Sequence, residues 1–295
     1  MVEYDRDWLR SYYDEYGERE WERWDASPVE QVKLEVHLYY LRKYLTADDR
    51  ILEIGAGPGR FTQELAKISN RIVVADLSPV QLELNRQNGQ RLGYDKSVEG
   101  WVECDVCDLR SCFDEGEFDA VVCYGGPLSY VFGEREKAMA ELLRVTKPGG
   151  LLFLGVMSLW GTVHQFLSGV LALDPAMNRE IVSTGDLGPD KPEATTHFCH
   201  LYRAAELRGV LERAGAAIEV LSASNCLSAT WGERLAEVPR DGATWQHLME
   251  MELEACREPG CLDMGTHLIA VCKKSSAGST PVRSSPRQAS PPAST

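Results

Sequence analysis

The chain has 295 residues, enough for one sizeable α/β domain with additions or for two small domains. Hydrophobic residues make up 44% of it and charged residues 26%, which excludes a collagen, a coiled coil or a wholly disordered chain. The 31 basic and 45 acidic residues leave a net charge of −14, and no long run of Lys or Arg is present. Because such a chain repels phosphate backbones, we expect no nucleic-acid partner.

The apolar stretches are too short to predict a membrane span. The longest one runs from Leu151 to Trp160 and is interrupted by Gly155 and Ser158. The N-terminal stretch MVEYDRDWLR is too charged for a secretory signal. The nine cysteines are odd in number, and several fall in apolar, strand-like runs, which favours reduced thiols. We therefore expect a cytoplasmic protein without a membrane partner.

The two ends of the chain differ in composition. Residues 275–295 are mainly Ser, Pro, Thr, Ala and Gly, and such a segment does not bury enough surface to offset its ordering entropy. We expect a disordered tail there. Residues 1–45 carry aromatic residues at helical spacing, followed by a second apolar stripe that starts after Ser27 and Pro28. These residues predict an N-terminal helical lid.

From residue 50 onward, short apolar runs alternate with helical segments. Strands are predicted at 51–55, 71–77, 97–104, 118–126 and 151–156. Helices are predicted at 58–69, 78–92 and 134–146. Strands that alternate with helices of this length indicate a parallel, doubly wound sheet.

The second half is less regular. It predicts helices at 159–173 and 204–214, a polar loop up to about 196, and strands at 217–222 and 266–274. One or two further helices are expected around Trp231 and Trp245, within 226–264.

A glycine-rich turn follows the first predicted strand, in the order Glu53-Ile54-Gly55-Ala56-Gly57-Pro58-Gly59-Arg60. Glycines allow a sharp turn and a close approach of backbone to ligand at the carboxyl end of a strand. The spacing is not the G-x-G-x-x-G of dinucleotide-binding proteins, and the G-K-[ST] of a P-loop is missing. The turn therefore predicts a ligand without a pyrophosphate.

The pattern E-x-G-x-G-x-G resembles motif I of class I S-adenosylmethionine-dependent methyltransferases. Asp76, Asp105-Val106 and Cys123-Tyr124 end the next strands in the order that this family shows, and residues 142–154 resemble its helix, turn and fifth strand. The resemblance covers about residues 29–274 and is densest over 50–156. The segments YYDEYG and WERWD are similar to ubiquinone/menaquinone-methylase-like enzymes.

This resemblance implies S-adenosylmethionine as the cofactor. Asp76 would bind the ribose hydroxyls, Asp105 and Val106 the adenine, and the backbone at Cys123 and Tyr124 the ammonium. The cofactor-binding residues that we predict are Glu53, Gly55, Ala56, Gly57, Asp76, Leu77, Asp105, Val106, Cys123, Tyr124 and Tyr12. Other roles stay open: Asp76 as a helix cap, Asp105 as a turn residue, and Glu53 as a support of the turn.

The fold implied by the resemblance is a Rossmann-like α/β domain over 46–274, with a seven-strand sheet. Its strand order would be 3-2-1-4-5-7-6, with an antiparallel last strand. Residues 217–222 would be strand six and 267–273 strand seven. Insertions at about 157–200 and 226–264 would add to the helical lid and form an acceptor pocket.

Methyl transfer requires orientation, exclusion of water and, for some acceptors, a base. Histidine titrates near neutrality and is suited to that role. The catalytic candidates are His164, His197, His200 and Tyr130, with Tyr124, Tyr12 and Tyr13 as alternatives and ordinary packing as the other explanation. Trp160, Trp231 and Trp245 are candidates for either the core or an apolar acceptor pocket.

The expected partner is a small-molecule methyl acceptor, with transfer to oxygen or nitrogen. The sequence Cys-Tyr-Gly-Gly-Pro-Leu at 123–128 differs from the [DN]-P-P-[YF] of many N-methylases that modify nucleic acids or proteins. Cys104-x-x-Cys107 has no second pair at matching spacing, so we predict no metal. A cofactor-binding sensor without catalysis and a nicotinamide-dependent oxidoreductase remain as alternatives.

Overall fold

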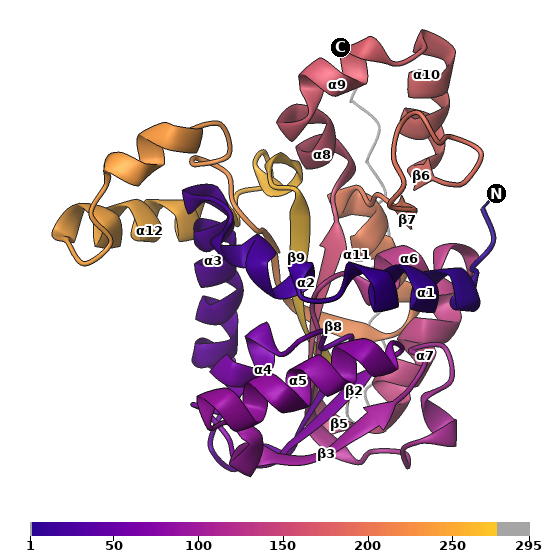
Figure 1. Ribbon diagram of the computed structural model, residues 1–295, viewed down its shortest axis with the longest axis vertical. Coiled ribbons are helices and arrows are strands. Elements are labelled where there is room, and N and C mark those ends of the chain that lie inside the picture. Colours follow the sequence, from indigo (N-terminus) through magenta and orange to yellow (C-terminus); the bar gives the residue numbers. More distant parts are fainter. Residues whose placement is uncertain (1, 276–295) are drawn as a thin grey trace, which may run out of the picture.

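The structure is a computed structural model that describes residues 2–275 (Figure 1). The tail predicted for 275–295 lies outside these residues except for Ser275. The centre of the fold is a seven-stranded sheet with the order β3-β2-β1-β4-β5-β9-β8. Its strands are β1 (Ile51–Ile54), β2 (Ile72–Asp76), β3 (Val98–Glu103), β4 (Phe118–Cys123), β5 (Thr146–Met157), β8 (Ala216–Ala223) and β9 (His267–Lys274).

The pairing confirms the predicted sheet. Strands β1 to β5 pair in parallel, whereas β9 runs antiparallel to both β5 and β8. Since β8 and β9 are the sixth and seventh strands of this sheet in chain order, the observed order is the predicted 3-2-1-4-5-7-6. All five parallel strands therefore end at one edge, where α/β sheets bind ligands.

Helices cover both faces of the sheet (Figure 1). The helices α3 (Pro28–Tyr44), α4 (Arg60–Leu65) and α5 (Pro79–Leu92) enclose one apolar core with one side of the strands. The helices α7 (Arg135–Val145) and α11 (Ala204–Arg213) enclose the other. The central strands read as continuous apolar runs because both of their faces are buried.

The N-terminal segment forms α1 (Arg6–Tyr16), α2 (Arg19–Glu22) and the 3-10 helix η1 (Arg23–Asp25) before α3 begins. Ser27 caps α3 as predicted, since its side chain accepts a hydrogen bond from the Glu30 amide. The end of α1 is held against α5: Gln81 Nε2 donates to the carbonyls of Tyr13 and Gly17, at 2.9 and 3.0 Å. This segment therefore lies over the ligand-binding edge of the sheet.

The insertion after β5 contains more helix than predicted. Instead of one helix over 159–173 and a loop to 196, it has α8 (Leu159–Gln165), α9 (Leu167–Ala172) and α10 (Pro175–Thr184). The Asp174 carboxylate accepts from the amides of Ala176 and Met177 and caps α10. A short hairpin of β6 (Asp186–Leu187) and β7 (Cys199–His200) follows, so that these elements form an arm at one end of the molecule (Figure 1).

The second insertion contains η5 (Gly232–Glu237), α12 (Ala243–Ala255) and η6 (Leu262–Met264), and α12 projects from the body of the protein (Figure 1). Trp245 is buried in the core on the α3 side. Trp160 and Trp231 are 42% and 50% exposed, so the expectation of a core or pocket position is wrong for both.

The remaining short elements are η2 (Asp95–Ser97), η3 (Leu109–Ser111), α6 (Pro127–Tyr130) and η4 (Phe132–Glu134). The strand β5 starts five residues earlier than predicted, because the Pro-Gly-Gly turn is part of an irregular pairing with β4. Over residues 2–275 we find no helix that combines the length and the apolar character needed to cross a bilayer.

Candidate functional site

The turn between β1 and α4 is the centre of the site. Its glycines at 55, 57 and 59 have φ angles of 71°, 54° and 102°, in the left-handed region. A side chain at Gly55 would strike Pro127, and one at Gly59 would strike the Tyr94 hydroxyl. The amides of Gly55 and Ala56 both donate to the carbonyl of Ala75, at 2.9 and 3.2 Å. The backbone thus folds tightly over the end of β2.

A buried polar network supports this turn from below. The Thr62 hydroxyl donates to Glu53 at 2.6 Å and accepts from Asn85 Nδ2 at 2.9 Å. The same Asn85 nitrogen lies 3.2 Å from the carbonyl of Gly57. Glu53 is 2% exposed and does not line a cavity, and burial raises its pKa to about 8. This position favours the interpretation that Glu53 supports the turn over one in which it contacts the cofactor.

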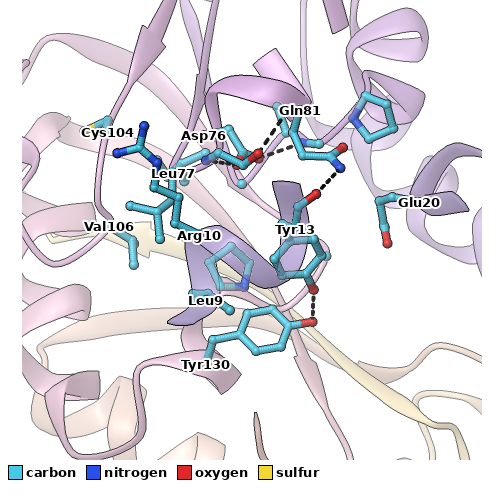
Figure 2. Close-up of a pocket in the computed structure, with 18 of the residues that line it drawn as sticks. Leu9, Arg10, Tyr13, Glu20, Asp76, Leu77, Gln81, Cys104, Val106 and Tyr130 are labelled. Carbon is cyan, nitrogen blue, oxygen red and sulfur yellow. Dashed lines mark hydrogen bonds between the residues drawn. The ribbon is translucent and has the colours of Figure 1, made fainter. Parts of the chain in front are cut away.

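Asp76 is at the carboxyl end of β2 and faces the cavity (Figure 2). Its two oxygens accept from the amides of Gly57 and Ser78, at 2.8 and 2.9 Å. Burial raises its pKa to about 6, although these backbone hydrogen bonds act in the opposite direction. The cap of α5 is Ser78, whose hydroxyl accepts from the Gln81 amide, so capping does not account for Asp76.

The next strand end adds a second carboxylate and an apolar slot. Asp105 lines the same cavity and accepts from the Cys107 amide at 2.8 Å and from the Tyr4 hydroxyl at 3.2 Å. The apolar side chains beside it are those of Leu77, Cys104 and Val106 (Figure 2). A planar base with an exocyclic amine fits this combination of an apolar slot and an acid.

The N-terminal segment closes this first cavity with residues that the sequence pattern did not single out, namely Tyr4, Leu9, Arg10, Glu20 and Arg23. Aromatic spacing indicates that α1 is a helix, but it does not show which of its faces points to the sheet. Tyr12 lines a second cavity instead of the first, and Tyr13 lines both. Cys123 and Tyr124 are buried in the sheet core and line neither cavity, whereas Gly125 lines the first.

The second cavity lies between the N-terminal segment, the arm and the start of β9. Its walls are mainly aromatic and aliphatic, with polar groups at a few points, as is typical of small-molecule sites. The two cavities share four lining residues, which are Tyr13, Glu20, Arg23 and Tyr130. A molecule in one cavity would therefore be next to a molecule in the other.

A chain of hydrogen bonds runs along this boundary. The hydroxyls of Tyr13 and Tyr130 are 2.5 Å apart, and His197 Nε2 is 3.0 Å from the Tyr130 hydroxyl (Figure 2 shows the tyrosine pair). Burial lowers the pKa of His197 to about 4, so its imidazole is neutral at pH 7. Burial also raises the pKa of Tyr130 well above its ordinary value. The neutral imidazole can accept a hydrogen bond from this hydroxyl.

The other two histidine candidates are not at this boundary. His200 lies 2.7 Å from Asp186 and 2.9 Å from Glu206 through its two ring nitrogens, and it lines neither cavity. These carboxylates raise the pKa of His200 against the effect of burial, which accords with a structural ion pair. His164 lies on α8 and also lines neither cavity, although Val163 and Gln165 line the second.

The cysteine pair lies at the end of β3, beside the first cavity. Cys104 and Cys107 are buried, and burial raises the pKa of both thiols. Over the described residues we find no group of three or more His, Cys, Asp and Glu side chains arranged to hold an ion.

The first cavity fits the cofactor that the resemblance implies. Asp76, Asp105 and Glu20 are carboxylates on its wall, and the glycine turn leaves backbone close to the ligand space. A ribose diol can donate to one of these carboxylates and an adenine amine to another.

The comparisons with known proteins agree with this geometry. Residues 51–150 match the family described as "Methyltransferase domain". A demethylmenaquinone methyltransferase of Clavibacter sepedonicus is 41% identical over 108 residues, which are 37% of this chain and 41% of that protein. A ubiquinone biosynthesis O-methyltransferase of Xanthomonas axonopodis pv. citri (strain 306) is 26% identical over 229 residues, or 72% of this chain and 81% of that protein.

A similar solved structure extends the agreement to the whole fold. It is the 1,6-didemethyltoxoflavin-N1-methyltransferase of Burkholderia thailandensis, with S-adenosylhomocysteine bound. The TM-score is 0.53 and the sequence identity is 16%. The match covers 91% of this chain and 88% of that one. This likeness establishes the fold, whereas the chain spans less than half of the Clavibacter relative.

Replacing Asp76 tests the ribose site. We expect Asp76→Ala to weaken S-adenosylhomocysteine binding by about 2–4 kcal/mol in calorimetry, because two charge-assisted hydrogen bonds are lost. Asp48→Ala, an exposed aspartate before β1, is the matched control and should bind normally. Equal affinity in the two variants would show that the ribose binds elsewhere.

The raised pKa of Glu53 predicts a pH-dependent stability. The folded state holds a proton on this carboxyl up to about pH 8, whereas the unfolded chain releases it near its ordinary pKa of 4.5. The free energy of unfolding should therefore fall as the pH rises from 5 to 8, by about 1–3 kcal/mol from this group. Denaturant titrations should show a smaller fall in Glu53→Gln than in the wild type.

The exposed Glu83→Gln variant is the control for this measurement and should keep the wild-type pH dependence. An identical slope in wild type and Glu53→Gln would mean that Glu53 is ionised in the folded protein.

Proposed function

We propose that this chain carries a class I S-adenosylmethionine-dependent methyltransferase domain. On that premise, it methylates an oxygen or nitrogen atom of a small organic acceptor. The domain match over 51–150 and the methyltransferase relatives support this enzyme class and its cofactor. The observation that carries the proposal is the boundary between the two cavities, at Tyr13, Glu20, Arg23 and Tyr130.

This boundary supports catalysis over cofactor sensing. A sensor has no need of a space beside the methyl-bearing end of its ligand, whereas a transferase requires one. The second cavity provides that space, and its apolar lining from the arm, including Val163, Phe166 and Val170, suits a small molecule rather than a polymer. The insertion at 157–200, with the N-terminal segment 1–45 as a lid, would then form the acceptor pocket.

The cofactor supplies a methyl group on a positively charged sulfur. The residues of the chain would orient the acceptor atom toward that group and keep water out. Tyr130 is placed to hydrogen-bond an acceptor hydroxyl or amine, and His197 is placed to hold the Tyr130 hydroxyl in position. Tyr130 is thus the catalytic residue of this proposal and His197 positions it, whereas His164 and His200 line neither cavity. The Xanthomonas relative is named an O-methyltransferase, which supports oxygen as the acceptor atom.

Two measurements on the full chain test this function. Calorimetry should show binding of S-adenosylhomocysteine and not of NADH. After incubation with S-adenosylmethionine and a mixed pool of phenols and aryl amines, mass spectrometry should detect a product heavier by one methylene unit. Binding of NADH without binding of S-adenosylhomocysteine would favour an oxidoreductase. Binding of S-adenosylhomocysteine without a methylated product from phenols, amines or a cell extract would favour a sensor.

The boundary tyrosine gives a sharper kinetic prediction. With the acceptor identified in that screen, Tyr130→Phe and His197→Gln should each lower kcat by about 10- to 1000-fold, because the acceptor atom loses the hydrogen-bonded pair that orients it. The affinity for S-adenosylhomocysteine should change little. Tyr39→Phe, on α3 and outside both cavities, is the matched control. A normal kcat in both boundary variants would remove this pair from the mechanism.

A further inference from the structure

One end of the second cavity gathers basic side chains. Lys33 of α3, which is 4% exposed, Arg23 of η1 and His267 at the start of β9 all line it. Lys33 Nζ lies 2.5 Å from Glu30, and Arg23 Nε lies 2.5 Å from Glu20. No other hydrogen bond from either cationic group is formed within residues 2–275. Most donors of an ammonium and of a guanidinium therefore remain for a ligand.

Neutral histidines surround these cations. His37 and His267 have their ring centroids 6.2 Å apart, and His37 Nδ1 lies 2.7 Å from the carbonyl of Lys33. Burial, together with the charges of Arg23 and Lys33, lowers the pKa of His37 to about 4 and that of His267 well below its ordinary value. Burial and the charge of Arg23 likewise lower the pKa of His197. These imidazoles are therefore neutral at pH 7, and the charged donors at this end are those of Lys33 and Arg23.

The carboxylates of the cavity do not offer a rival site for a cation. Glu20 and Glu30 are each paired with a cation at 2.5 Å, and Glu193 is exposed. An amine that entered would have to displace Arg23 or Lys33 from a short ion pair. An anion would instead meet the donors of Lys33 and Arg23 that these ion pairs leave free.

Flat aromatic rings line the wall beside this basic end. Tyr12 stacks on His197 and on Tyr16, with centroid distances of 5.3 and 5.8 Å and an interplanar angle of 15° in both cases. All three rings line the cavity. Stacked rings of this kind offer a face to a planar ligand.

We propose that the second cavity binds a planar aromatic molecule through a carboxylate, which lies among Lys33, Arg23 and His267 while the ring lies against Tyr12. If the cavity is the acceptor site, as the proposed function holds, the methyl acceptor is an aromatic carboxylate.

The test compares three probes of one shape in calorimetry with the full chain and no cofactor: naphthoate, naphthamide and naphthylmethylamine. We expect naphthoate to bind at least about tenfold tighter than the neutral amide, and the amine to bind weakest. Lys33→Met and Arg23→Gln should each abolish the preference for naphthoate over naphthamide. Lys43→Met changes an exposed lysine of the same helix and should leave the preference unchanged.

Thermal unfolding will show whether each variant is folded. Even if a variant does not fold, the preference of the wild type for naphthoate over naphthamide decides the proposal. Equal affinity for naphthoate and naphthamide, tighter binding of the amine, or a preference that survives in folded Lys33→Met and Arg23→Gln would each overturn it. Because the cofactor is left out, a failure of S-adenosylhomocysteine to bind would contradict the proposed function alone and leave the carboxylate site standing.

Discussion

The backbone from Gly55 to Gly59 passes so close to Pro127 and to the Tyr94 hydroxyl that a side chain fits at neither end of the turn. The turn brings the amide of Gly57 to within 2.8 Å of Asp76, and this contact holds the carboxylate toward the first cavity. Beneath it, the buried side chains of Glu53, Thr62 and Asn85 hydrogen-bond to one another in place of water. The position of Asp76 on the cavity wall depends on this packing, because β1 and β2 end at the same edge.

The N-terminal segment depends on the same edge. Gln81 of α5 holds the carbonyls of Tyr13 and Gly17, and the hydroxyl of Ser78 lies 2.5 Å from Asp14. Ser78 directly follows the β2 end that carries Asp76. The helix α1 is therefore attached to the part of the sheet that faces the ligand, and it contributes to the walls of both cavities. Movement of this segment would open both cavities together.

Both cavities carry charged side chains of either sign. The first has three carboxylates and three arginines, whereas at one end of the second Lys33 and Arg23 keep free donors beside their ion pairs with glutamates. Arg23 and Glu20 lie between them as a short ion pair, so that the boundary itself is nearly neutral.

The sheet, the glycine turn and the acids at the strand ends could be predicted from the sequence, because each depends on local pattern. Apolar runs that alternate with helices imply parallel strands, and parallel strands bring Asp76 and Asp105 to one edge. The helices α8, α9 and α10 were less visible, since the break at Phe166 and the cap at Asp174 interrupt an otherwise continuous apolar pattern. The exposed positions of Trp160 and Trp231 likewise follow from how the insertions pack, which composition does not reveal.

By itself, the sequence determined the doubly wound sheet, the phosphate-free character of the glycine turn and the carboxylates around it, because those features arise from short-range spacing. Only the tertiary structure decided which histidine lies at the boundary. His197 and His200 are three residues apart, yet one bonds Tyr130 and the other is paired with Asp186 and Glu206. The basic end of the second cavity was decided in the same way: Arg23, Lys33 and His267 come from η1, α3 and β9, and only the packing of these elements brings them together.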